Sequence, residues 1–158
     1  YPSIMVFGIS DSNALRKNIQ KIQNDYDIIL IDGTPSLSKL VSTIILLGDI
    51  VLIPIRPSGL DLWATEKFIE KYDQAKTLKE DVKAYFVLNQ YDEKININKE
   101  SKEVLEELEI GVLKTTIKSR IAYVEAVVQG MGVYEYRDTK AKKEMTKLTK
   151  EVLDLLTA

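Results

Sequence analysis

Asp32 occupies a position in the sequence pattern at which an acidic side chain can bind a ligand. Asp32 directly follows the almost wholly apolar run 27–31 and precedes Gly33. The run predicts a strand buried on both faces of a parallel sheet, and ligands of open α/β sheets bind beyond the carboxyl ends of such strands. A carboxylate at that place can hold a magnesium ion, usually through water. A turn or a helix cap uses an aspartate at such a position equally well.

A second set of polar residues follows the next apolar run. Residues 50–55 predict another buried strand, in which Pro54 must lie near the end because proline has no N–H for a sheet. The turn after this strand contains Pro57, Ser58 and Asp61. It leads into a predicted helix over 61–78, which Asp61 can cap.

An amide pair ends the third predicted strand. Residues 82–89 form this strand, and Asn89 and Gln90 lie at its end. An amide side chain carries a donor and an acceptor together, which is the combination needed to read the edge of a base. A turn residue at the end of a strand explains Asn89 equally well.

Basic residues gather on the last predicted helix, 138–156. Six of them lie between 137 and 150, against the acidic residues Asp138 and Glu144: Arg137, Lys140, Lys142, Lys143, Lys147 and Lys150. The apolar stripe of the helix is predicted to pack on the core: Met145, Leu148, Val152, Leu155 and Leu156. The lysines form either a solvated face or a surface for the phosphates of duplex DNA, and the second alternative predicts steep salt dependence.

The elements that position these residues alternate between strands and helices. Ser10 or Asp11 is a plausible cap for a helix to Asn24. Further helices are predicted over 37–47, 99–108 and 120–129, and short strands over 4–7 and 111–116. Such alternation indicates an α/β fold with a mainly parallel sheet flanked by helices. Because no linker-like segment interrupts the pattern, we expect a single domain over 1–158.

Composition excludes several classes of protein. The 158 residues contain 22 basic and 24 acidic side chains, for a net charge of -2, with neither cysteine nor histidine. A disulfide framework, the usual zinc sites, a Ser-His-Asp triad and a Cys-His dyad are therefore excluded. The apolar runs are much shorter than the roughly 20 residues that span a bilayer. We expect no signal peptide, because the sequence opens Tyr-Pro-Ser with no basic lead. We expect a cytoplasmic protein with no membrane partner.

Two classes of protein share an apolar strand that ends in aspartate. One is the Walker B strand of a P-loop nucleotidase, and the other is the phosphoacceptor strand of a response-regulator receiver domain. A receiver also needs an acidic pair on an earlier strand and a Lys-Pro well downstream. The run 4–7 ends without acids, and the nearest analogue of Lys-Pro is Arg56-Pro57. These differences disfavour the receiver.

The order and spacing of the motifs resemble the ParA-type partition ATPases, above all their small ParF-like members. The resemblance runs from about Asp25 to the C-terminus and covers several landmarks in sequence. They are Tyr26-Asp27 through Asp32-Gly33, the strand that begins at Asp49, the turn Pro57-Ser58-x-x-Asp61, Thr116-Ile117-x-x-Arg120-x-x-Tyr123-x-Glu125-Ala126, Gly132-Val133-Tyr134-Glu135 and the closing helix with Lys150-Glu151-Val152. The resemblance implies a P-loop NTPase fold of the deviant-Walker type, with ATP or ADP and magnesium as ligands.

Site residues follow from the resemblance by position. Asp32 matches the Walker B acid, a catalytic residue that orders magnesium through water. Asn89 and Gln90 match the region that lines the adenine pocket, and Pro57, Ser58 and Asp61 match the turn beside the nucleotide. Arg120 matches a basic residue near the nucleotide-dependent dimer or its DNA-binding face. The same face would include Lys140, Lys142, Lys143 and Lys147.

The resemblance also implies partners. Such a protein would form dimers or polymers around ATP, bind duplex DNA non-specifically on the nucleoid, and respond to a centromere-binding partner protein. The cycle would segregate a plasmid or a chromosome locus.

One departure from the family concerns its phosphate-binding loop. None of the seven glycines is followed by lysine, so the chain contains no Gly-Lys-Ser/Thr motif. We therefore expect the chain to be the C-terminal part of such an ATPase, without the N-terminal strand, and inactive alone. Unpaired strand edges such as that of 28–31 would promote self-association. The alternative is a non-catalytic α/β module that binds a partner or itself.

Overall fold

The computed structural model describes residues 4–33 and 39–157, except for the side chains of residues 59, 60 and 62–64. The described residues form two compact units, which are treated separately below. The first unit comprises residues up to Gly48 and the segment Lys67–Val82. The second unit comprises Asp49–Glu66 and the segment from Lys83 onward. The helix α3 (Gly59–Lys76) contributes to both.

Two helices in contact with each other begin the first unit: α1 (Ser12–Ile22) and α2 (Lys39–Leu47). The Asp11 carboxylate accepts hydrogen bonds from the backbone N–H groups of Asn13 and Ala14, at 3.0 and 2.8 Å. The predicted cap of this helix is thereby confirmed as Asp11, since the side chain satisfies N–H groups that a helix start leaves without partners. The predicted start of α2 at residue 37 lies outside the described residues.

The strands predicted over 27–31 and 4–7 are not formed. Neither segment belongs to the sheet or to any isolated bridge of the described residues. Ile28 and Leu30 are 59% and 88% exposed, and Ile4 is 87% exposed. An apolar run becomes a strand only when a neighbouring strand takes up its N–H and C=O groups. No described strand does so here, which is why the prediction from apolar pattern alone is wrong for this structure.

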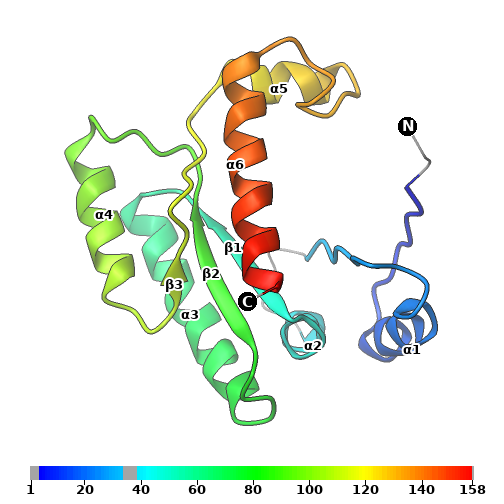
Figure 1. Ribbon diagram of the computed structural model, residues 1–158. Helices are drawn as coiled ribbons and strands as arrows, with labels where there is room; N and C mark the ends of the chain where they lie inside the picture. The colour runs from blue at the N-terminus through cyan, green and yellow to red at the C-terminus, as the bar shows by residue number, and fades with distance from the viewer. Residues whose placement is uncertain (1–3, 34–38, 158) are drawn as a thin grey trace. The chain divides into compact units, whose positions relative to one another are not determined.

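The sheet of the second unit contains β1 (Ile50–Ile55), β2 (Lys83–Leu88) and β3 (Gly111–Val112). Their spatial order is β1-β2-β3 and both pairings are parallel, which confirms the predicted fold class (Figure 1). The register pairs Ile50 with Lys83 and Ile55 with Leu88. Pro54 is the penultimate residue of β1, an edge strand within the described sheet, where proline is tolerated.

The third strand is shorter than the prediction of 111–116. Leu113 N–H donates to the Phe86 carbonyl at 2.9 Å and Ile117 N–H donates to the Leu88 carbonyl at 2.8 Å. Between them, the N–H groups of Lys114 and Thr115 donate instead to a carboxylate of the last helix. The chain therefore leaves the sheet for two residues because a side chain competes for its backbone donors.

Three further helices complete the second unit: α4 (Asn96–Glu106), α5 (Ile121–Val128) and α6 (Thr139–Leu156). The α4 helix begins three residues before the predicted helix 99–108 and ends two residues before its predicted end. Figure 1 shows α6 running along one face of the sheet. The Asp138 carboxylate caps α6 by accepting from Ala141 N–H at 2.8 Å.

The predicted apolar stripe of α6 is confirmed as core for four of its five residues, and the prediction is wrong for Leu156. Four of its five residues pack against a cluster of buried side chains from β2 and the segment after β3, and Leu156 instead is 44% exposed. The cluster and the stripe comprise Val87, Leu113, Ile117, Met145, Leu148, Val152 and Leu155. Phe86 and Leu88 are fully buried and alternate with Val87, so they point to the opposite face of the sheet.

No helix within 4–33 or 39–157 is long and apolar enough to cross a membrane.

Candidate functional site

The turn after β1 is held by its own side chains. Arg56 and Asp61 form an ion pair at 3.0 Å, and the Arg56 side chain remains 62% exposed. Asp61 N–H donates to Ser58 Oγ at 3.3 Å, and Ser58 N–H donates to the Arg56 carbonyl at 2.8 Å. Pro57 is buried beneath the turn. The predicted residues Pro57, Ser58 and Asp61 thus form one compact loop at the start of α3.

The turn after β2 lies at the same edge of the sheet. Asn89 N–H donates to the Ile55 carbonyl at 2.8 Å, which joins the carboxyl ends of the two strands. Asn89 Oδ1 accepts from Gln90 N–H at 3.0 Å, so the amide Nδ2 is the donor that this side chain can present to a ligand. Gln90 has a φ of 55°, which is uncommon for a non-glycine residue and turns the chain sharply.

Five of the six predicted nucleotide and magnesium residues therefore meet at one sheet edge. The hydrogen bond between Asn89 and Ile55 fixes the distance between the two turns. The sixth residue, Asp32, belongs to the first unit, is exposed and follows a segment without strand structure. Among the described residues no group of three or more acidic side chains could hold a metal ion by itself. The predicted roles of all six residues remain predictions.

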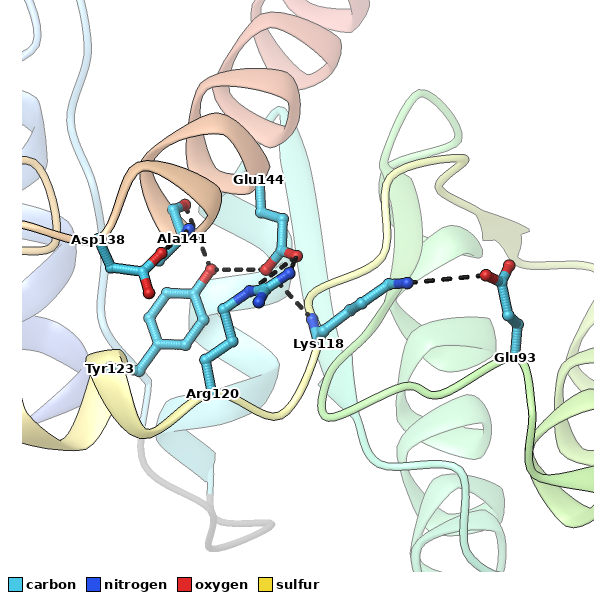
Figure 2. A network of polar contacts seen from close by, with 7 residues as sticks. All are labelled: Glu93, Lys118, Arg120, Tyr123, Asp138, Ala141 and Glu144. Carbon is cyan, nitrogen blue, oxygen red and sulfur yellow. Dashed lines mark hydrogen bonds and ion pairs between the residues drawn. The ribbon is translucent and has the colours of Figure 1, made fainter.

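Arg120 lies in a network with α6 (Figure 2). Its Nε and Nη2 atoms donate to Glu144 Oε1 at 3.0 and 2.5 Å. Tyr123 Oη donates to Glu144 Oε2 at 3.1 Å, and Lys118 N–H reaches the same oxygen at 3.4 Å. Arg120 is also the N-cap residue of α5. The structure thus gives Arg120 a structural partner, while its predicted role at a DNA or dimer face stays a prediction.

The electrostatics of the network follow from its burial. Burial would raise the pKa of Glu144, but hydrogen bonds from Arg120, Tyr123 and the Lys118 backbone outweigh it and lower the pKa. Burial, followed by the hydrogen bond to Glu144, raises the pKa of Tyr123 well above its usual value. Glu144 is therefore a carboxylate, and Tyr123 a neutral phenol, across the physiological range.

A second carboxylate of α6 has a similar function. Glu151 accepts the N–H groups of Lys114 and Thr115 at 2.7 and 2.9 Å. Burial would raise its pKa, but the hydrogen bonds from Thr115 and Lys114 lower it. The sequence analysis did not predict that Glu144 and Glu151 accept hydrogen bonds from the backbone of residues 114–118. Glu144 and Glu151 are seven residues apart and so lie on one helix face beside the apolar stripe, which is the signal that could have identified them.

The predicted basic surface lies partly around a cavity. Lys140, Lys143 and Lys147 are exposed on α6, and Lys142 is half-buried. Arg120 and Lys140 line an open cavity of about 500 Å³ at the start of α6. These cations can contact an anionic surface, but their predicted role in binding DNA stays a prediction.

Comparison with known proteins shows which family the chain belongs to. A family model described as "AAA domain" matches residues 3–86, more than half of the chain. The maintenance of carboxysome distribution protein A of Halothiobacillus neapolitanus is 31% identical over 147 residues, which cover 91% of this chain and 68% of that protein. A virulence plasmid ParA family protein of Chlamydia psittaci is 24% identical, with coverage of 89% and 54%. The chain belongs to the ParA family of AAA-domain proteins.

A solved structure supports the fold of this ParA-family chain. Cobyrinic acid a,c-diamide synthase from Mycobacterium smegmatis, with bound ADP and magnesium, superposes with a TM-score of 0.60 at 19% identity. The match covers 75% of this chain and 53% of the synthase. The ParA-family chain thus has the architecture of a P-loop NTPase, as the sequence predicts. It spans about two thirds of the first relative and about half of the second relative and of the synthase.

Proposed function

We propose that this chain is part of a partition or positioning ATPase and supplies the base side of its nucleotide site. The observation that carries the proposal is the joining of two turns at one sheet edge. Asn89 and the loop 57–61 come together there because Asn89 N–H is bonded to the Ile55 carbonyl. This is the end of a parallel sheet at which α/β proteins bind ligands.

The Asn89 side chain at this edge fits the base of a nucleotide. Asn89 Nδ2 offers a donor for a base, because Oδ1 is already fixed by Gln90 N–H. A base can accept that donor at a ring nitrogen or carbonyl. Magnesium usually takes one or two carboxylates and completes its coordination with phosphates and water. Asp32 in the first unit is one such carboxylate, and its role as a magnesium ligand is part of the proposal.

The chain's own residues would bind and orient the ligand. Bound ATP and magnesium supply the phosphoryl group and the positive charge that stabilises its transfer. The Asn89 amide fixes the base, and the rigid hydrogen bond to Ile55 holds that amide at a defined distance from the loop after β1. Ser58 is held by Asp61 N–H, so the loop keeps its shape without a ligand.

The proposal extends to the partners. Exposed lysines on α6 would contact phosphates of duplex DNA without reading sequence, and the affinity would fall steeply with salt. The assembled protein would associate with itself, and a centromere-binding protein would regulate its cycle. The chain alone should show no steady-state ATP hydrolysis.

Calorimetric titration with magnesium-ATP tests the nucleotide site. We expect weak binding that falls about fivefold in Asn89→Ala, because one good hydrogen bond contributes roughly 1 kcal/mol. The Gln20→Ala variant removes an exposed amide from α1 and should bind as the parent chain does. A chain that binds no nucleotide, or an Asn89→Ala variant with unchanged affinity, would contradict the proposed site.

A further inference from the structure

Positive and negative side chains are nearly balanced around the start of α6. The open cavity at this place is lined by three cations and two acids: Arg120, Arg137, Lys140, Glu125 and Asp138. Both acids already have partners in the protein. Glu125 accepts a hydrogen bond from the Tyr136 hydroxyl, and Asp138 accepts from Ala141 N–H at 2.8 Å. The lining by itself therefore has one more positive side chain than negative ones.

A further acid, Glu144 of α6, neutralises the remaining positive charge. Arg120 Nε and Nη2 donate to Glu144 Oε1 at 3.0 and 2.5 Å, and Figure 2 shows the guanidinium directed at this carboxylate. The third nitrogen of the guanidinium, Nη1, makes no hydrogen bond to the residues that the structure describes. Arg120 therefore brings a donor to the cavity, but its charge is compensated by the carboxylate beside it.

The carboxylate that compensates Arg120 is itself fixed in place. The Glu144 side chain is 14% exposed, and its second oxygen, Oε2, accepts from Tyr123 Oη at 3.1 Å and from Lys118 N–H at 3.4 Å. Burial would raise the pKa of Glu144, but the hydrogen bonds from Arg120 and Tyr123 lower it. Glu144 is therefore an ionised carboxylate at neutral pH, and two further donors hold it beside the arginine.

We propose that Glu144 lowers the affinity of the α6 surface for phosphates by neutralising Arg120. The inference rests on the proposed contact between α6 and duplex DNA, and it assigns a residue that sets the strength of that contact. A phosphate at Arg120 Nη1 would be attracted by the cation and repelled by the carboxylate close to it, so the two effects largely cancel. The exposed lysines of α6 have no such partner carboxylate and provide the phosphate contacts: Lys140, Lys143 and Lys147.

Binding of a short fluorescent DNA duplex, measured by anisotropy at neutral pH without nucleotide, tests the inference. Glu144→Gln keeps the length of the side chain and an acceptor for Arg120 but removes the negative charge. The affinity should rise about fivefold near 0.1 M salt, as one partly solvated contact between charges provides. The slope of affinity against salt should steepen by about 0.9, the value of one added phosphate contact. A purely structural role of Glu144 would instead lower the affinity or leave it unchanged.

Glu151→Gln is the matched control on the same helix. Glu151 accepts from the backbone N–H groups of Lys114 and Thr115, so its replacement removes the same charge without changing the charge state of an arginine. Two helical turns, about 10 Å, separate it from Glu144, and salt at 0.1 M screens a charge over about that distance. The affinity should therefore change less than about twofold. A gain equal to that of Glu144→Gln would assign the effect to net charge and overturn the inference.

The double variant Arg120→Gln with Glu144→Gln removes both charges of the pair. It should bind DNA as the parent chain does, within about twofold, because the gain from Glu144→Gln depends on Arg120. A double variant that keeps this gain, or that binds about fivefold more weakly than the parent, would overturn the inference.

The parent chain distinguishes failure of the inference from failure of the DNA contact. If the parent binds the duplex and Glu144→Gln binds no more tightly, the inference is wrong and the DNA contact stands. If neither chain binds at low salt, both are wrong. Circular dichroism checks that each variant is folded under the conditions of the assay.

Discussion

Replacement of Glu144 by alanine should destabilise the second unit by about 2–3 kcal/mol. The carboxylate is 14% exposed and pairs with Arg120, which is 23% exposed. An exposed ion pair contributes roughly 0–1 kcal/mol, whereas loss of one partner of a fully buried pair costs roughly 3–5 kcal/mol. Because the Arg120–Glu144 pair is only partly exposed, the cost of losing Glu144 should lie between these two values. Tyr123 would also lose its bond to Glu144, although its hydroxyl retains the Ala141 carbonyl at 3.4 Å.

Urea unfolding followed by circular dichroism measures the effect. With a slope of about 2 kcal/mol per molar, the midpoint should fall by roughly 1 M while the slope stays constant. Lys143→Ala removes an exposed charge from the same helix turn and should change stability by less than about 0.5 kcal/mol. Glu144→Gln keeps the size and one acceptor, so it should fall between Glu144→Ala and the parent chain.

A double-mutant cycle separates the ion pair from other effects. Arg120→Ala with Glu144→Ala should cost less than the sum of the two single variants, by about 1–2 kcal/mol, because the second change removes a partner already lost. The reasoning fails if Glu144→Ala costs less than 0.5 kcal/mol, or if the two substitutions are additive. Either result would mean that the apolar stripe of α6 holds the helix on the sheet by itself.

Acid should weaken the attachment of α6 to the sheet. The pKa values of Glu144 and Glu151 lie below the ordinary 4.5 in the folded state. Their contribution to the free energy of unfolding is therefore complete above pH 4.5 and is lost as the pH falls through the folded values. A chain carrying Glu144→Gln and Glu151→Gln should therefore show a flatter stability profile between about pH 5 and pH 3 than the parent, and an unchanged slope would refute the assignment. Gly111→Ala should cost about 1–3 kcal/mol, because its Cβ would lie 2.7 Å from Tyr85 Cδ1. The penalty should largely disappear in a Tyr85→Ala background, and a cost that persists there would indicate a backbone cause instead.

The sequence by itself determined the elements whose signals are local. The cap of α1 was narrowed to Ser10 or Asp11, since a cap depends on a side chain and the N–H groups two or three residues onward. The apolar runs of β1 and β2 indicated buried parallel strands, and the spacing of Met145, Leu148 and Val152 indicated the core face of α6. The order of these motifs also sufficed to recognise the ParA family.

Tertiary structure decided what depends on distant partners. The run 27–31 has the composition of a strand, but a strand exists only where another strand accepts its hydrogen bonds. The length of β3 was decided by Glu151, because its carboxylate takes the N–H of Thr115, which lies between the two N–H groups that bond to β2. The partner of Arg120 lies 24 residues further along the chain. No local pattern encodes such a contact, since only the packing of α6 on the sheet brings Glu144 to it.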